Sequence, residues 1–237
     1  MRVPIIKVDR LWHIGDLDIT RKYTCGTSQE GNLFSVSRCP AAWRKIVKLG
    51  GFDLYVGNAG YALMDMLSIT HPTTQAGRQL QSQVRQWAYQ QELLEPRTVI
   101  QGRYYDDELE QTCLAQLTPQ DVEDADPDQY EQIDRVIIHA PTEKLCKIHN
   151  LRSSRDEEAF DFALIEWART HHGTTLDGVY WNQHYNPSAY QAPRAGLFEA
   201  NIEKLIKCDA FPANEQELIQ VGRISWAELQ PETQYSQ

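Results

Sequence analysis

The sequence predicts an α+β fold in one domain. Short strand-like runs alternate irregularly with medium-length amphipathic segments, and the regular β-α-β alternation of a parallel sheet is absent. The chain has 237 residues, of which 41% are hydrophobic, so it can bury one substantial core. We therefore expect residues 1–237 to form a single domain.

The first two predicted strands carry polar groups among apolar neighbours. In residues 11–14, His13 places one imidazole in a run that otherwise suits a core. In residues 33–37, Ser35 and Ser37 share one face because strand side chains alternate. Both strands are therefore candidates for a functional site.

The remaining elements follow without a fixed period. Helical spacing of apolar residues, with proline or a capping pattern at the start and glycine at the end, predicts the helices. Short β-branched and aromatic runs predict the strands. The predicted helices cover residues 40–49, 74–92 and 154–172, with an amphipathic segment at 217–224, and the predicted strands cover residues 52–56, 97–103, 134–140, 179–181 and 195–198.

Charge is distributed unevenly along the chain. The formal net charge is −10, but residues 104–134 contain eleven acidic residues and no Lys or Arg. Leu109, Leu114 and Leu117 in this acidic insert have roughly helical spacing. We expect a partly helical flap beside the functional site, held by the basic N-terminal part. Because the field at a cleft is local, the net charge argues little against an anionic ligand.

Cysteine usage and hydropathy indicate a cytoplasmic protein without a membrane partner. The five cysteines are widely spaced and form no Cys-x-x-Cys pair, which argues against a disulfide framework and a zinc site. No segment approaches the roughly 18 apolar residues of a membrane span. No His-x-x-x-His pattern is present, so we expect no metal site, and a metal-dependent hydrolase is a weaker hypothesis.

Three short motifs follow one another in a characteristic order. They are Trp12-His13-Ile14-Gly15, Gly31-Asn32-Leu33-Phe34-Ser35 and Asp177-Gly178-Val179. In this order they resemble the histidine, aromatic-serine and acidic motifs of the ADP-ribosyltransferase superfamily, in its diphtheria-toxin-like and poly(ADP-ribose)-polymerase-like branch. The resemblance implies a catalytic domain of two packed, mostly antiparallel sheets with flanking helices. Leu33 or Phe34 stands where that family has tyrosine, and Asp177 stands where it has glutamate.

The resemblance also implies that NAD is the substrate and assigns residues to it. His13 would orient a ribose, Phe34 would stack on the nicotinamide ring and Ser35 would bind its amide. The further NAD-binding candidates are Gly15, Ser37 and Arg38. The chain has no Gly-x-Gly-x-x-Gly fingerprint, so a Rossmann unit is not indicated.

Two acids are candidates for the catalytic carboxylate. Asp177 would stabilise the positive charge that develops on the ribose as nicotinamide leaves. Glu199, after the strand-like run at 195–198, is the reserve candidate.

The resulting functional hypothesis is transfer of ADP-ribose from NAD to a macromolecular acceptor, either protein or nucleic acid. A freestanding transferase of this kind suggests a toxin, an effector or a defence protein, with an inhibitor or antitoxin as a further partner. The alternative is a non-enzymatic binding or immunity protein that docks a basic partner through its acidic segment. NAD titration would distinguish the two.

Overall fold

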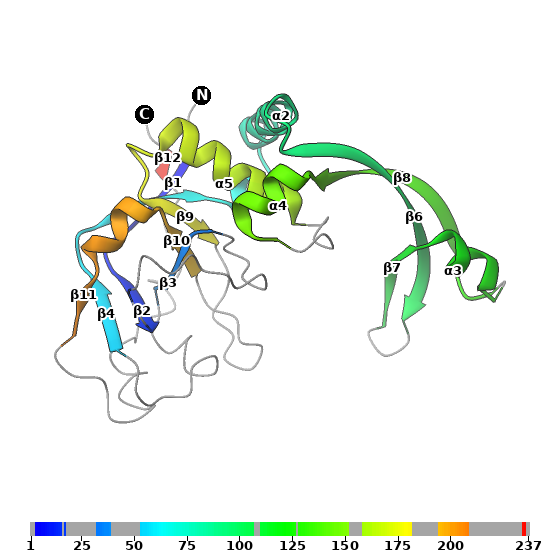
Figure 1. The fold of residues 1–237 in the computed structure, drawn as a ribbon, viewed down its shortest axis with the longest axis horizontal. Coiled ribbons are helices and arrows are strands. Elements are labelled where there is room, and N and C mark those ends of the chain that lie inside the picture. Colours follow the sequence, from blue (N-terminus) through cyan, green and yellow to red (C-terminus); the bar gives the residue numbers. More distant parts are fainter. Residues whose placement is uncertain are drawn as a thin grey trace.

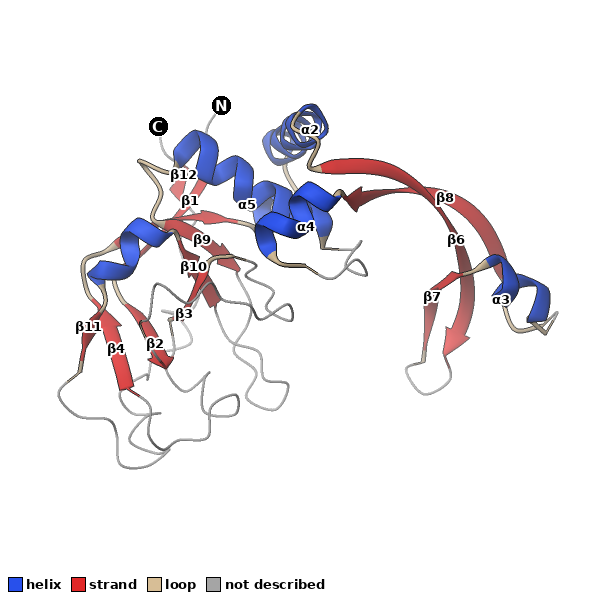
Figure 2. Ribbon diagram, viewed as in Figure 1, coloured by secondary structure: helices blue, strands red, loops and turns tan. Residues whose placement is uncertain are grey.

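The computed structural model is a mixed α+β fold, as the sequence predicts (Figure 1). It describes residues 3–15, 17, 32–38, 53–106, 110–126, 128–151, 158–181, 194–208 and 234–235. A large curled sheet forms the body, helices cover one of its faces, and a smaller sheet projects from those helices as an arm (Figure 2). The predicted helix at 40–49 and the amphipathic segment at 217–224 lie outside the described residues.

Among the described residues the larger sheet contains nine strands and is mostly antiparallel. They are β1 (Pro4–Val8), β2 (Leu11–Gly15), β3 (Phe34–Ser37), β4 (Asp53–Gly57), β5 (Tyr61–Asp65), β9 (Gly178–Trp181), β10 (Arg194–Leu197), β11 (Ile206–Lys207) and β12 (Gln234–Tyr235). Their order is β11-β4-β2-β3-β10-β9-β5-β1-β12. Only β5 and β9 pair in parallel among these strands. The strands expected at 11–14, 33–37, 52–56, 179–181 and 195–198 are all confirmed.

The two faces of this sheet bury different cores. One face packs on the helices through Leu33, Met64 and Val179. The other, called the inner face here, carries a separate apolar cluster that includes Ile6, Leu63, Phe34, Val36 and Leu197. Each fully buried side chain of this kind stabilises the fold by roughly 1.5–3 kcal/mol.

Helices pack against this sheet. They are α1 (Leu67–Thr70), α2 (Gln75–Gln90), α4 (Glu143–His149), α5 (Ala159–His172) and the 3-10 helix η2 (Glu199–Lys204). The Oγ1 of Thr74 accepts a hydrogen bond from the backbone N–H of Gly77 and so caps α2. Leu80, Val84 and Ala88 form the buried stripe of that helix at four-residue spacing. None of the helices in the described ranges is long and apolar enough to cross a membrane.

The arm is a three-stranded sheet in the order β7-β6-β8. Its elements are β6 (Leu94–Asp106), β7 (Gln111–Leu117), α3 (Pro119–Asp124) and β8 (Gln132–Pro141). The long strands β6 and β8 pair from Leu94 and Pro141 at the base to Arg103 and Gln132 further out. They carry the smaller sheet away from the body, so it stands on the helices instead of packing face to face on the larger sheet (Figure 1). The expectation of two packed sheets therefore needs correction.

The acidic insert also differs from its expected form. Residues 104–134 make the outer part of the arm, where only α3 is helical among the described residues. Leu117 is buried and Leu114 is 62% exposed, because residues three apart in a strand point to opposite faces. Figure 1 shows this part of the arm reaching away from the N-terminal strands, so it does not form a flap against them.

Candidate functional site

His13 lies buried on the inner face of the large sheet, where two of the sequence motifs meet. Its Nδ1 is 2.8 Å from the backbone oxygen of Ser35 on the neighbouring strand β3, so Nδ1–H donates to that carbonyl. Its ring lies against that of Phe34, with the centroids 4.4 Å apart and the planes tilted by 46°. The ring of Tyr55 lies on its other neighbour strand, with its centroid 6.3 Å away, so a hydrogen bond and aromatic contacts hold the imidazole.

Gly15 makes room for this imidazole. Its φ is +146°, and a Cβ added there would lie 3.0 Å from the Nε2 of His13. Any other residue would therefore be strained in its backbone and would press on the edge of the ring.

The serines of β3 lie on the other face of the strand from Phe34. Leu33 belongs to the core under the helices and Phe34 to the core of the inner face, so the strand alternates as expected. Ser37 is 1% exposed. Because of this alternation, the structure brings the backbone of Ser35 to His13, whereas the Ser35 hydroxyl projects on the opposite face from the Phe34 ring.

The strand register places His13 in a row of side chains that crosses the inner face. The pairing of Trp12 with Ser37 puts His13 beside Val36. Read across β4, β2, β3, β10, β9 and β5, the row is Tyr55, His13, Val36, Ala195, Tyr180 and Asp65. Directly paired residues project to the same face. Val36 and Ala195 in the middle of the row are fully buried in the apolar cluster of this face, and they lie between the imidazole on one side and the phenol and carboxylate on the other.

The far end of this row holds buried polar atoms. Asp65 is 3% exposed; its Oδ2 accepts a hydrogen bond from the hydroxyl of Ser68, and its Oδ1 has no hydrogen-bond partner. The Tyr180 hydroxyl is also buried, and the guanidinium of Arg38 lies beside it. An unsatisfied buried polar group costs roughly 1–3 kcal/mol, and such groups gather where a ligand or water binds.

Arg38 belongs to the same end of the row. Burial raises the pKa of Tyr180, the nearby guanidinium of Arg38 opposes that shift, and the carboxylate of Asp65 adds to it. A cation, a phenol and a carboxylate thus interact within the inner face. Arg38 was a candidate from the sequence, whereas Asp65 and Tyr180 were not. Asp65 is the last residue of a short strand-like run, and Tyr180 lies within another.

Asp177 has a different position. Its Oδ2 accepts a hydrogen bond from the backbone N–H of Ala62 at 2.8 Å, and its Oδ1 pairs with the ammonium of Lys204 at 2.6 Å. Its backbone oxygen accepts from the N–H of Phe198 and the side-chain amide of Asn201. Asp177 therefore ties the start of β9 to β5 and η2. It precedes a strand that is three places from that of His13 in the sheet.

Glu199 lies on the helix side of the molecule. It is exposed at the start of η2 and lines an open pocket of about 400 Å³ together with Arg169 and His171. The guanidinium of Arg169 covers the ring of Phe198 there, 5.6 Å from its centroid. The structure does not bring Glu199 to the row that contains His13.

A partly buried network anchors the chain at its entry into β3. The backbone N–H of Asn32 donates to the Nδ1 of His149, and the amide oxygen of Asn32 accepts from Arg169 at 2.8 Å. Glu166 lies 3.1 Å from the Nε2 of His149 and also pairs with Arg169. Burial lowers the pKa of His149, with Glu166 opposing the shift. Helices α4 and α5 thereby fix the approach to Phe34.

The described residues offer no cluster of three or more His, Cys, Asp or Glu side chains that could hold a metal ion. Comparisons of the chain with protein-family models, with curated proteins and with solved structures find no match. Function must therefore be argued from the chemistry of the site.

Proposed function

We propose that this protein is an NAD-dependent ADP-ribosyltransferase whose site lies on the inner face of the curled sheet. The observation that carries the proposal is the row described above. It joins the His13 and Phe34 motifs at one end to Tyr180 and Asp65 at the other, and the Oδ1 of Asp65 is buried there without a hydrogen bond.

The reaction breaks the bond between nicotinamide and C1′ of the ribose. Nicotinamide leaves with the electron pair, and a nucleophile of the acceptor forms the new bond to C1′ and loses its proton. His13 would hold the nicotinamide ribose in place, with Phe34 as the aromatic wall beside it. Arg38 would bind the pyrophosphate through its planar donor fork.

A carboxylate near C1′ would stabilise the positive charge of the transition state. Asp65 suits this role better than Asp177, because both carboxylate oxygens of Asp177 are engaged by Ala62 and Lys204. Asp65 keeps its Oδ1 without a hydrogen bond on the face that carries His13. It would therefore act on the ribose, while Asp177 would hold the strands together.

The roles of Asp65 and His13 can be tested by measuring the release of nicotinamide from NAD by the full chain. We expect Asp65→Asn to lower turnover by about 10²–10³, the usual loss when one electrostatic stabiliser of a transition state is removed. His13→Ala should mainly raise KM. The matched control is Glu199→Gln on exposed η2, which should leave both constants unchanged.

Two outcomes would count against this assignment. Unchanged turnover in Asp65→Asn would place the acid elsewhere. Absence of nicotinamide release from the wild-type chain, with and without a cell lysate as the source of acceptor, would overturn the enzymatic function. Labelled NAD added to lysates treated with protease or with nuclease would identify the acceptor as protein or nucleic acid.

The arm supports a second candidate function, which is docking of a basic protein partner. Its apolar side chains Ile137, Leu114 and Tyr105 are 70%, 62% and 52% exposed, next to an excess of carboxylates. Exposed apolar groups with a charged rim are typical of protein interfaces. Calorimetric titration that detects no NAD binding would place this function first.

A further inference from the structure

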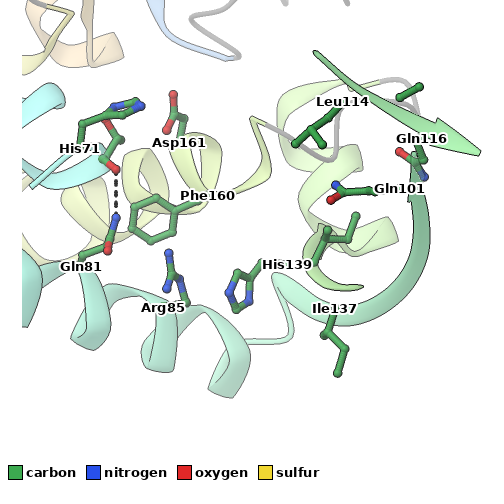
Figure 3. Close-up of a pocket in the computed structure, with 13 residues that line it drawn as sticks. His71, Gln81, Arg85, Gln101, Leu114, Gln116, Ile137, His139, Phe160 and Asp161 are labelled. Carbon is green, nitrogen blue, oxygen red and sulfur yellow. Dashed lines mark hydrogen bonds between the residues drawn. The ribbon is translucent and has the colours of Figure 1, made fainter. Parts of the chain in front are cut away.

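A cavity of about 450 Å³ lies at the base of the arm, between the arm and the helices of the body (Figure 3). We call it the arm-root cavity. Its lining comes from three places: the end of α1 with α2, the start of α5, and all three strands of the arm. It shares no residue with the row that contains His13, and it has the size of a small-molecule site.

Arg85 is the cation of this cavity. Its guanidinium carbon lies 5.2 Å over the ring centroid of Phe160, so its flat face is covered. Its Nε is buried and makes no hydrogen bond, and no carboxylate of the described residues pairs with it. A guanidinium stacked in this way still presents N–H donors along its edge, which match the oxygens of an anion.

His139 provides a second donor beside Arg85. Figure 3 shows its ring next to the guanidinium. Its Nδ1 is hydrogen-bonded to the hydroxyl of Tyr89. Burial lowers the pKa of His139 and the charge of Arg85 lowers it further, so both effects favour the neutral ring. In the tautomer whose Nδ1 accepts the Tyr89 proton, the N–H of His139 is on Nε2.

The arm side of the cavity is chemically different. Gln101 and Gln116 face it with amide groups, and Leu114 adds an apolar surface (Figure 3). Paired strand positions place the two glutamines side by side. Amides of this kind can donate to and accept from the edge of a planar heterocycle. Asp161 is the carboxylate of the lining. It lies beside His71, at the end of the cavity away from the two glutamines (Figure 3).

We propose that the arm-root cavity binds a nucleotide-sized ligand with a single phosphate group, which lies between Arg85 and His139 while the rest of the ligand lies against the arm. Residues 104–134 carry eleven acidic residues and no Lys or Arg, so the neighbouring arm repels a polyanion such as nucleic acid. A ligand of this size touches arm and body together, and its binding fixes one relative to the other. The inference is independent of the proposed NAD chemistry.

The test is isothermal titration calorimetry of the full chain with AMP, adenosine and inorganic phosphate. AMP should bind at least about tenfold more tightly than adenosine, because loss of a hydrogen bond to a charged group typically costs this much. Arg85→Gln should weaken AMP binding by about tenfold or more. Arg78→Gln, on the exposed side of the same helix, should leave it unchanged.

Two further variants locate the ligand. Gln101→Ala should weaken binding of AMP and not of phosphate, because Gln101 is placed to contact the organic part. His13→Ala should leave AMP binding intact. The proposal is overturned if wild-type protein does not bind AMP, if AMP and adenosine bind equally, or if Arg85→Gln, folded by circular dichroism, binds as the wild type does. Loss of AMP binding in His13→Ala alone would assign AMP to the inner face of the large sheet and would also overturn it.

Discussion

Asp65 and Asp177 show how the surroundings of a carboxylate separate a structural role from a chemical one. Asp177 has a partner for each oxygen, whereas Asp65 is more deeply buried and has one oxygen without a partner. Hydrogen bonds hold a carboxylate in its ionised form and also occupy it. An occupied carboxylate stabilises strands, and an unoccupied one is available to a substrate.

Asp177→Ala should therefore weaken the fold strongly. We expect a loss of about 2–4 kcal/mol in the free energy of unfolding, because the backbone N–H of Ala62 loses its acceptor and Lys204 its counter-ion. Urea unfolding followed by circular dichroism measures it. Glu199→Ala, exposed on the neighbouring helix, should stay within about 0.5 kcal/mol of the wild type. Equal stability of the two variants would contradict the anchoring role of Asp177.

Asp161 makes the fold sensitive to pH. Burial first, and then the charge of Glu158, raise the pKa of Asp161 to about 6. The folded state thus binds more protons than the unfolded state between about pH 4 and pH 6, so this group's contribution falls as pH rises through that window. Asp161→Asn removes the charge.

The variant should be more stable than the wild type above pH 6, by about 1–3 kcal/mol, and equal to it near pH 4. Thermal unfolding at pH 4.5 and pH 7.5 checks this difference. Asp124→Asn, exposed on α3, is the control and should show no pH-dependent gain. A gain of Asp161→Asn that is the same at both pH values would show that the ionisation is not its cause.

At the scale of elements, the sequence predicts those helices and strands that neighbouring residues alone determine. The Thr74 cap and the four-residue apolar spacing of α2 lie within one short segment of the sequence, and that helix forms as expected. The strands expected at 97–103 and 134–140 form as β6 and β8, whereas the segment of β7 differs from expectation because Leu114 and Leu117 satisfy a helical spacing while the ladder to β6 decides the structure. A strand depends on a partner elsewhere in the chain, and no short window contains both.

The same distinction applies to the candidate site. His13 and Phe34 were identified from their own strands and do lie together. Asp65 and Tyr180 entered the site through the parallel register of β5 and β9, which pairs residues from distant parts of the sequence. No local pattern specifies that register, so their place in the row could not be predicted from the sequence.

The arm should be removable as an element. Arg103 and Gln132 are paired in β6 and β8, so an Asn-Gly turn can replace residues 104–131 and still match the antiparallel ladder. We expect the melting temperature of the body to change by only a few degrees, because the base of the arm with its helix contacts remains. Thermal unfolding and size-exclusion chromatography check this. An aggregated variant would show that the outer arm is an integral part of the core.

At the scale of the whole molecule, the arm carries the excess of negative charge, whereas the candidate site lies on the large sheet. Residues 104–131 contain ten acidic residues and no basic ones, so the shortened chain would have a formal net charge of 0 instead of −10. The outer arm therefore supplies the whole negative balance at a distance from the inner face of the large sheet. A protein near zero net charge associates more readily, so the shortened chain should be less soluble at neutral pH.

The parallel pairing of β5 with β9 also governs the order of events during synthesis. Leu63 pairs with Gly178, which is synthesised 115 residues later, and Ser37 pairs with Arg194, which is synthesised 157 residues later. At typical translation rates this interval is on the order of ten seconds. During that time the first strands emerge from the ribosome with open edges, which other chains can join. The sheet is thus completed only after β9 and β10 have been synthesised, and the strands made earlier keep open edges until then.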